Sequence, residues 1–169
     1  LENYKEKIQV VAINDLGSIE ANAHLVKYDS THGTLPYDVE TSKDGFKILN
    51  QNIKVFAERD PANLPWGKEG VDVVLECTGL FLDKVSAEKH IKAGAKKVII
   101  SAPAKNVDFT IVQGVNSKDL KKEHNIISNG SCTTNCLAPV AMVLEKNFGI
   151  EYGYMTTIHS YTGDQKLLD

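Results

Sequence analysis

The chain has 169 residues, of which 42% are hydrophobic and 24% charged, and its net charge is −3. These values predict one soluble globular domain with a sizeable core, or one domain and a piece of another. The longest apolar runs are far too short to cross a bilayer, and a slightly acidic chain is a poor candidate for nucleic-acid binding. Three cysteines, an odd number, argue against a disulfide framework and favour a reducing, cytosolic compartment.

Strand-like and helix-like segments alternate along the chain. The apolar runs that predict strands lie at residues 8–14, 71–79, 96–103, 109–116 and 124–128. Helical spacing is found at 19–28 and 84–95, whereas 46–61 holds two short runs typical of paired strands. Apolar strands separated by amphipathic helices predict an α/β fold, with a parallel sheet that helices cover on both faces.

Small and polar residues follow the expected strands: Asn14-Asp15, Thr78-Gly79, Ser101 to Pro103, and the turn from Ser128 to Cys132. In parallel sheets ligands bind at these carboxyl ends. Residues 152–161 differ, since they alternate and are rich in tyrosine and threonine, which suits an antiparallel strand. We therefore expect a domain boundary at the Cys132 turn, with one domain over 1–131 and the beginning of another over 132–169.

Cys132 lies where a strand gives way to a helical pattern over about 133–147. A thiol at a helix N-terminus faces unpaired N–H groups and the positive end of the dipole, which favours the nucleophilic thiolate. The usual alternative is a small buried hydrophobe, but the neighbouring Ser-Thr-Thr hydroxyls make a poor apolar core and a good anion pocket. Pro139 predicts an irregular first helical turn.

The other two cysteines carry weaker signals. Cys136, one helical turn on, could be a resolving thiol, a metal ligand or part of the core. Two cysteines without matched ligands are weak evidence for metal, so we expect none and favour a core or supporting role. Cys77, inside an apolar run, is expected to be structural.

His159 is the candidate general base. A base must come within hydrogen-bond reach of its thiol in the fold, although it need not be near in sequence. Polar groups surround it, from Ser160, Tyr161, Thr162 and Asp164. His24, His90 and His124 are interpreted as surface or packing groups. His32 lies in a turn. From spacing alone, catalytic and structural roles for His159 are equally open.

Asp15 ends the first expected strand. In a dinucleotide-binding unit a carboxylate there accepts hydrogen bonds from the adenosine ribose and repels the extra phosphate of NADP. A turn-forming Asn-Asp pair is a common alternative, and the Gly-rich fingerprint expected about twenty residues earlier is absent from this chain. Arg59 is the one arginine among nineteen basic residues, so a bidentate anion clamp must use it or lie outside the chain.

Residues 128–139, SNGSCTTNCLAP, closely resemble the active-site signature of the phosphorylating glyceraldehyde-3-phosphate dehydrogenases. Six further stretches match that family in order: AINDL, HLVKYDSTHG, ERDP, ECTGLF, KKVIISAPAK and TTIHSYTGDQ. Seven matches in one order identify the chain as a member. The resemblance implies a Rossmann-like, doubly wound, mostly parallel sheet that is incomplete at its N-terminus, followed by the start of an α+β catalytic domain.

The resemblance also implies a mechanism. Cys132 would attack the aldehyde of D-glyceraldehyde 3-phosphate, His159 would activate the thiol, and hydride would pass to NAD. Inorganic phosphate would then convert the thioester to 1,3-bisphosphoglycerate. The positions matched to the phosphate sites are Ser131, Thr133, Thr162 and Asp164. The positions matched to cofactor contacts are Asp15, Arg59, Thr78, Gly79, Phe81 and Ser101.

Two departures from the family pattern stand out. Gly130 stands where the family usually has alanine. The match covers only about the middle half of a family member, without the Gly-rich turn in front and without most of the catalytic domain behind. We therefore expect this chain alone to have little or no activity and to be prone to aggregation. The parent protein is expected to be a cytoplasmic homotetramer in glycolysis that prefers NAD to NADP.

Three alternatives stay open. Erythrose-4-phosphate dehydrogenase shares the cysteine signature and would be separated by its substrate. A hydrolase built on a Cys–His pair would need no NAD. A truncated, non-enzymatic fragment would show an ordinary thiol pKa and no NAD binding.

Overall fold

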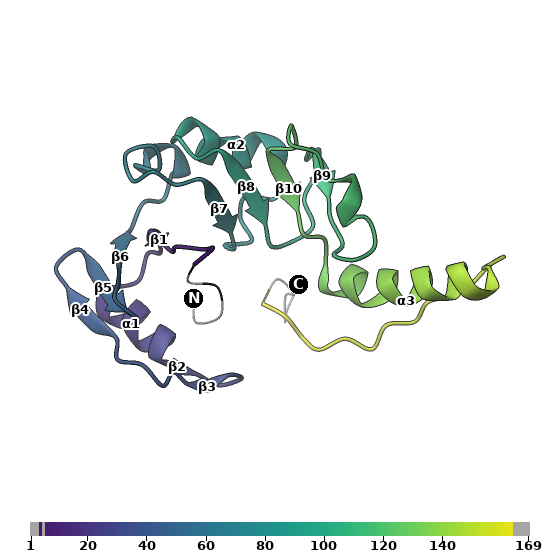
Figure 1. Ribbon diagram of the computed structural model, residues 1–169, viewed down its shortest axis with the longest axis horizontal. Coiled ribbons are helices and arrows are strands. Elements are labelled where there is room, and N and C mark those ends of the chain that lie inside the picture. Colours follow the sequence, from purple (N-terminus) through teal and green to yellow (C-terminus); the bar gives the residue numbers. More distant parts are fainter. Residues whose placement is uncertain (1–3, 5, 164–169) are drawn as a thin grey trace, which may run out of the picture. The chain divides into compact units, whose positions relative to one another are not determined.

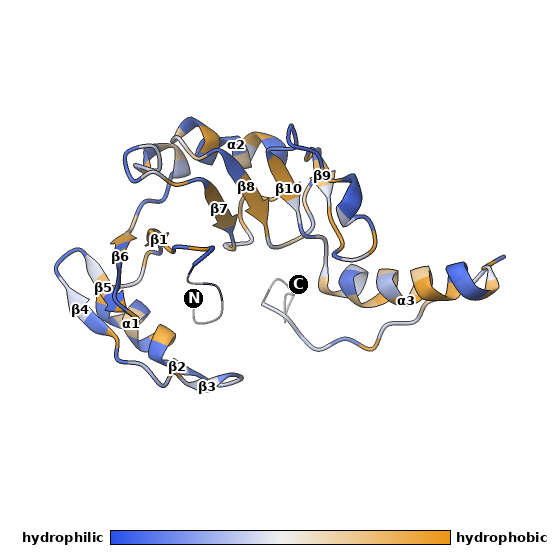
Figure 2. Ribbon diagram, viewed as in Figure 1, coloured by the Kyte–Doolittle hydropathy of each residue, from blue (hydrophilic) through white to orange (hydrophobic). Residues whose placement is uncertain are grey.

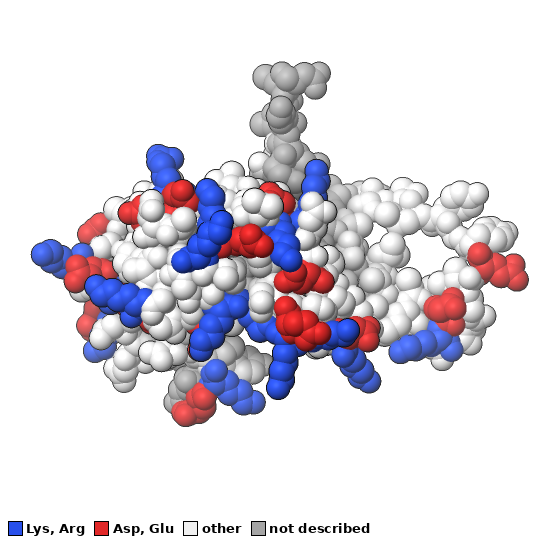
Figure 3. Space-filling model, turned by 90° about the horizontal axis from the view of Figure 1, so that it is seen from above, with Lys and Arg blue, Asp and Glu red and all other residues white. Residues whose placement is uncertain are grey.

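The computed structural model describes residue 4 and residues 6–163 (Figure 1). The chain divides into two units, Leu1–Val71 and Asp72–Asp169. No helix among the described residues is both long enough and apolar enough to pass through a membrane. Basic and acidic side chains are interspersed over the face seen in Figure 3. Several charges pair directly, among them Lys54 with Glu69 and Lys84 with Asp108, each at 2.6 Å.

The first unit is a small mixed sheet with one helix packed on it. The strand order is β1-β6-β5-β4, in which β1 and β6 are parallel and the other neighbours antiparallel. Its elements are β1 (Ala12–Asn14), α1 (Ile19–Lys27), β2 (Tyr28–Asp29), β3 (Gly33–Thr34), β4 (Glu40–Ser42), β5 (Gly45–Ile48), β6 (Gln51–Phe56) and the 3-10 helix η1 (Pro61–Asn63). Ala23 of α1 is buried in one cluster with Phe46, Ile48 and Ile53 of the sheet.

Local sequence accounts for the helix and the hairpin of this unit. The Ser18 hydroxyl caps α1 by accepting the N–H of Ala21 at 3.1 Å. Between β5 and β6, Leu49 and Asn50 have φ angles of 48° and 64°. Two consecutive positive φ angles give the tight turn whose twist suits a hairpin. The predicted helix at 19–28 and the paired strands within 46–61 are confirmed.

The second unit is a parallel sheet of strand order β7-β8-β10-β9. Its elements are β7 (Val73–Glu76), α2 (Lys84–Lys92), β8 (Lys97–Ile100), β9 (Phe109–Thr110), the 3-10 helix η2 (Ser117–Asp119), β10 (Ile126–Ser128) and α3 (Cys132–Phe148). Ala87 of α2 packs on Val98, Ile100 and Ile126, and none of the four is more than 2% exposed. The strands β7, β8 and β10 are correspondingly apolar in Figure 2.

Helix α3 differs from expectation at its start. It is one continuous α-helix of 17 residues with Pro139 inside it, and the first turn is regular. The proline removes the hydrogen bond that its own N–H would have given to the Asn135 carbonyl, and its ring crowds that carbonyl, which lies after the first turn. The turn before it is held by an N-cap, so the irregularity predicted from Pro139 does not occur.

Three strand predictions need correction, and a fourth segment forms no strand. Of residues 8–14 only β1 is a strand, and it is partly exposed; β7 is shorter than 71–79, with Leu75 67% exposed; and of residues 109–116 only the two residues of β9 form a strand. Each lies at the edge of its sheet among the described residues, so it is paired on one side only. Residues 152–161 have no regular structure, because a strand needs a hydrogen-bonded neighbour and no described strand pairs with them. The predicted α/β class, with mostly parallel strands and helices, is confirmed.

Candidate active site

The chain passes from β10 to α3 through a tight, hydrogen-bonded turn. Ser128 is fully buried; its hydroxyl donates to the Ala102 carbonyl at 2.8 Å and accepts the N–H of Gly130 at 3.0 Å. Gly130 has a φ of 69°, in the left-handed region that glycine adopts without strain. Glycine therefore suits this turn at the position where alanine was expected.

Ser131 and Asn135 fix the first turn of α3, in which Cys132 is the first residue. The Ser131 hydroxyl accepts the N–H of Thr134 at 2.9 Å. The Asn135 side chain donates to the carbonyls of Asn129 and Ser131, at 2.7 and 2.9 Å. Asn135 was not singled out from the sequence as a residue that supports this turn. The one signal for it in the sequence is its position one helical turn after the capping serine.

The structure brings together Cys132 and His159, which lie 27 residues apart in the sequence. The distance from Cys132 Sγ to His159 Nε2 is 2.9 Å, and His159 Nδ1 lies 2.6 Å from the Ser160 carbonyl oxygen. Because a carbonyl oxygen can only accept, Nδ1 carries the hydrogen and Nε2 presents its lone pair to the thiol. This is the tautomer that a base needs in order to take the thiol proton.

The pKa of the Cys132 thiol is lowered from its ordinary value. The hydrogen bond to His159 is the largest cause and outweighs the opposing effect of desolvation. The backbone N–H and the hydroxyl of Thr133, and the charge of His159, lower the pKa further. A thiol at a helix N-terminus with these partners is equipped to act as a thiolate nucleophile.

The hydroxyl groups predicted to hold phosphate flank this pair. Ser131 and Thr133 lie directly before and after the thiol, and both are half-buried. Thr162 lies three positions after His159 in an exposed segment. Asp164 lies outside the described residues. Two of the four predicted positions are therefore placed next to the Cys132 sulfur.

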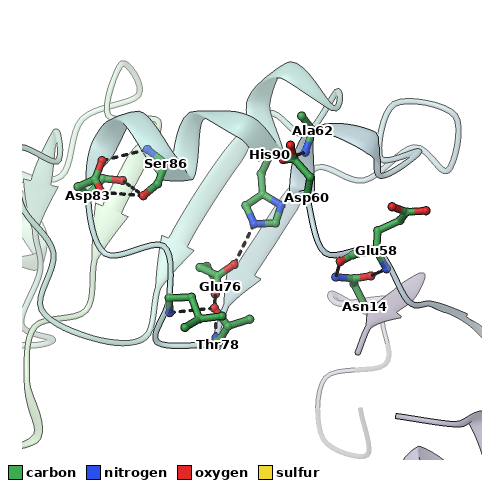
Figure 4. Close-up of polar contacts among 10 residues, drawn as sticks. Asn14, Glu58, Asp60, Ala62, Glu76, Thr78, Asp83, Ser86 and His90 are labelled. Atoms are coloured by element: carbon green, nitrogen blue, oxygen red, sulfur yellow. Dashed lines mark hydrogen bonds and ion pairs between the residues drawn. The ribbon is translucent and has the colours of Figure 1, made fainter. Parts of the chain in front are cut away.

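In the first unit, two predicted cofactor residues follow neighbouring parallel strands. Asp15 directly follows β1 and Arg59 lies three residues after β6, so both lie at the same edge of the sheet. Asn14 joins the two strand ends, because its side chain exchanges two hydrogen bonds with the backbone of Glu58, at 2.9 and 3.0 Å (Figure 4). The exposed Asp15 carboxylate accepts the N–H of Gly17 at 2.7 Å. Asn14 was not singled out from the sequence as a positioning residue.

In the second unit, Thr78 and Gly79 follow β7, and Ser101 follows its parallel neighbour β8. Gly79 has a φ of 72°, and a Cβ built there would meet no other atom within 4 Å. The ring of Phe81 packs edge-on against His90, with the ring centres 6.3 Å apart. The turn at Gly79, at the end of β7, therefore has a backbone that a ligand can approach closely.

These residues fit the NAD that the resemblance implies. Asp15 offers an exposed carboxylate at a strand end for the ribose hydroxyls. The open turn at Gly79 leaves room for a dinucleotide to lie against the backbone. Both features belong to the carboxyl ends of parallel strands, where such ligands bind.

Other reactive side chains are placed differently from expectation. Cys77 and Cys136, expected to be structural or in the core, are exposed in the described part of the chain. Within that part, no group of three or more His, Cys, Asp or Glu is placed to hold a metal ion. His90 is a packing group, as predicted, but it is buried and paired with Glu76.

Two domain families of the same enzyme match the chain. Residues 2–84 match the NAD binding domain of glyceraldehyde 3-phosphate dehydrogenase, and residues 131–169 match the C-terminal domain of the same enzyme. The cofactor is therefore NAD.

Bacterial proteins named glyceraldehyde-3-phosphate dehydrogenase are similar over nearly the whole chain. The relative from Pseudomonas aeruginosa is 56% identical over 167 residues, which are 99% of this chain and 50% of the relative. The relative from Streptomyces coelicolor is 55% identical over 96% of this chain and 48% of the relative. The relative from Xanthobacter flavus is 54% identical over 100% of this chain and 50% of the relative. The chain spans about half the length of these relatives. It belongs to the glyceraldehyde-3-phosphate dehydrogenase family.

Proposed function

We propose that the protein containing this chain oxidises D-glyceraldehyde 3-phosphate to 1,3-bisphosphoglycerate, with NAD and inorganic phosphate, through a thioester on Cys132. The observation that carries the proposal is the 2.9 Å contact between Cys132 Sγ and His159 Nε2 at the start of α3. A thiol with a matched base and a lowered pKa is what covalent aldehyde chemistry requires. The names of the similar proteins supply the substrate.

In the first half-reaction, His159 Nε2 accepts the thiol proton while Cys132 Sγ forms a bond to the aldehyde carbon. The carbonyl oxygen takes that proton back from Nε2, which gives a thiohemiacetal on Cys132 and leaves Nε2 free to act as a base again. Nε2 then withdraws the proton of that hydroxyl as the carbon loses its hydride and the thioester forms. NAD, when bound, supplies the acceptor for the hydride. The hydrogen bond from Nδ1 to the Ser160 carbonyl keeps Nε2 aimed at the sulfur throughout.

In the second half-reaction, an oxygen of inorganic phosphate attacks the thioester carbon and the Cys132 thiolate leaves. The acyl phosphate is released, and the thiolate together with the proton held on His159 Nε2 restores the starting thiol and imidazole, so atoms and charges balance. We assign Ser131 and Thr133 to the attacking phosphate, since their hydroxyls and the helix N-terminus suit an anion. Thr162 and Asp164 are assigned to the phosphate of the substrate, by resemblance alone.

The cofactor contacts are assigned on the same basis. Asp15 binds the adenosine ribose, which favours NAD over NADP. Arg59, Thr78, Gly79, Phe81 and Ser101 are assigned to the remaining cofactor contacts at the two sheet edges. We also place the boundary between the NAD-binding and catalytic domains between Ser131 and Cys132, because the thiol helix and its base both follow it.

The decisive experiment measures NADH formation by the full-length protein. Glyceraldehyde 3-phosphate and erythrose 4-phosphate are each supplied with and without inorganic phosphate. We expect turnover with the triose that depends on phosphate, and a loss of more than about a thousandfold in Cys132→Ser, since removing a nucleophile has this effect or a larger one. Preference for erythrose 4-phosphate would instead assign the neighbouring activity. Acid release without NAD would assign a thiol hydrolase.

The proposal extends to the whole assembly. By resemblance, the full-length protein is a homotetramer that acts in glycolysis in the cytoplasm. Light scattering of the purified full-length protein tests the first of these points, and a mass of one or two subunits would contradict it.

A further inference from the structure

A buried pair of ionisable side chains lies beneath the turn that follows β7. Glu76 at the end of β7 and His90 of α2 are 3% and 4% exposed, and Glu76 Oε2 lies 2.9 Å from His90 Nε2 (Figure 4). Both are far from Cys132 in the sequence and neither takes part in the chemistry proposed above. Such a buried pair is weak evidence for added stability, because desolvation offsets much of its attraction.

The second oxygen of the same carboxylate holds the turn. Glu76 Oε1 accepts both the backbone N–H of Thr78, at 2.8 Å, and the Thr78 hydroxyl. The Thr78 hydroxyl oxygen in turn accepts the N–H of Leu80 at 3.1 Å. One carboxylate therefore sets the backbone on both sides of Gly79, where the cofactor is expected to approach.

The charge state of Glu76 suits this role. Burial acts to raise its pKa, but the hydrogen bonds from His90 and Thr78 outweigh burial and leave the pKa lowered. An ionised carboxylate can only accept, so His90 Nε2, Thr78 N–H and the Thr78 hydroxyl all donate to it. Without a donor from His90, one carboxylate oxygen would remain buried and unpaired, and the group would become protonated or turn toward solvent.

We propose that Glu76 and His90 form a positioning pair that holds the Thr78–Leu80 turn in the conformation that binds NAD. The pair acts on the cofactor through the turn and touches neither the substrate nor Cys132. The proposal rests on the assignment of this turn to the NAD site. It predicts that His90 controls the affinity for NAD and leaves the chemical step unchanged.

The test compares two variants of the full-length protein at His90. His90→Leu removes the donor, whereas His90→Gln places an amide N–H near the position of Nε2. We expect the dissociation constant for NAD, measured by calorimetry, to rise about tenfold in His90→Leu and to return to within about threefold of wild type in His90→Gln, because a hydrogen bond to a charged group has this effect. The KM for NAD should follow the dissociation constant, while kcat and the rate of Cys132 alkylation stay the same. Amide exchange at Thr78 and Leu80 should accelerate in His90→Leu alone.

Asp108→Asn is the matched control. It removes a carboxylate that binds Lys84, Asn125 and Ile126 in the same unit and has no contact with Glu76, so it should lower stability without changing NAD affinity.

If His90→Leu folds and binds NAD as wild type does, the proposal is wrong. If His90→Leu does not fold, Glu76→Gln decides, since it keeps the shape of the side chain but replaces one accepting oxygen with a donor. Unchanged NAD affinity in that variant refutes the proposal, and weakened NAD affinity with an unchanged kcat supports it. A wild-type protein that does not bind NAD would refute the cofactor assignment and, with it, this role for the pair.

Discussion

The hydrogen bond between His159 and Cys132 depends on the orientation of the imidazole ring. Among the causes of the lowered thiol pKa, the hydrogen bond between the two side chains is larger than the charge of the imidazole. The bond from Nδ1 to the Ser160 carbonyl sets that orientation. A residue with the same polarity but a different reach is therefore not expected to replace His159.

We predict that His159→Asn will slow turnover by about 10²–10⁴-fold, the usual contribution of a general base. The same change should shift the pH midpoint of Cys132 alkylation upward. Alkylation follows the thiolate, and the partner that lowers the thiol pKa is lost, so more alkaline solution is needed for the same rate. The measurement is the rate of reaction with iodoacetamide against pH in the full-length protein. His124→Asn, a histidine stacked on Phe109 in the same unit, should leave the midpoint unchanged. An unchanged midpoint in His159→Asn would contradict the base assignment.

At the scale of elements, one side chain joins α2 to the strand that leads to Cys132. Asp108 Oδ1 accepts from Lys84 at 2.6 Å, while Oδ2 accepts the N–H groups of Asn125 and Ile126 at 2.8 and 2.9 Å. The hydrogen bond from Lys84 is the largest cause that lowers the pKa of Asp108, to about 2. This carboxylate joins the first turn of α2 to the start of β10.

Asp108→Asn should therefore lower the free energy of unfolding at pH 7 by about 1–2 kcal/mol, after allowance for the partial exposure of Lys84. The folded-state pKa lies below the ordinary value, so the stabilisation is present above about pH 4 and is lost as the pH falls through about 2. Urea unfolding at pH 7 and at successively lower pH measures the difference, which should shrink over that window. Asp72→Asn, which removes an exposed ion pair with Lys96, should change stability by less than about 0.5 kcal/mol. A difference between Asp108→Asn and wild type that does not depend on pH would contradict this account.

The hairpin β5–β6 depends on a glycine for a packing reason. A Cβ built on Gly45 would overlap the Ile53 carbonyl oxygen and lie 3.0 Å from the Cα of Lys54. Gly45→Ala should therefore destabilise the protein by about 3 kcal/mol or more, because backbone atoms of β6 must move. Gly33→Ala is the control, since Gly33 has a φ of 84° but open space around it, and its cost is expected near 1 kcal/mol. Equal losses in thermal unfolding would show that packing at Gly45 is not the cause.

At the scale of the whole molecule, α3 has an apolar row that no described residue buries. The members of the row are 42–83% exposed: Leu137, Val140, Val143, Leu144 and Phe148. A helix in a globular protein normally packs such a row against a second layer. The relatives that match this chain are about twice as long.

We predict that the 169-residue chain alone will aggregate and have less than about 1% of the activity of the full-length protein, since large exposed apolar surfaces associate. Size-exclusion chromatography and NADH formation measure the two quantities. Val140→Glu combined with Leu144→Lys should reduce aggregation of the isolated chain and prevent correct folding of the full-length protein. A monodisperse isolated chain with full turnover would show that the row needs no cover and that the chain is catalytically sufficient.

The α/β class, the helices at 19–28 and 84–95 and the family follow from the amino-acid sequence alone, because hydrophobic periodicity and short signatures are local properties. The strand-to-helix junction at Cys132 also follows from it, since the apolar spacing changes there from strand-like to helical.

Contacts between residues that are far apart in the chain can be seen only in the folded protein. The approach of His159 to Cys132 across 27 residues, and of His90 to Glu76 across 14, depends on how loops and helices return to the sheet. The lengths of β1 and β7 depend on which of their edges are paired with another strand. The exposure of Cys77 and Cys136 depends on which residues pack against them. These are non-local contacts, for which a run of residues carries no signal.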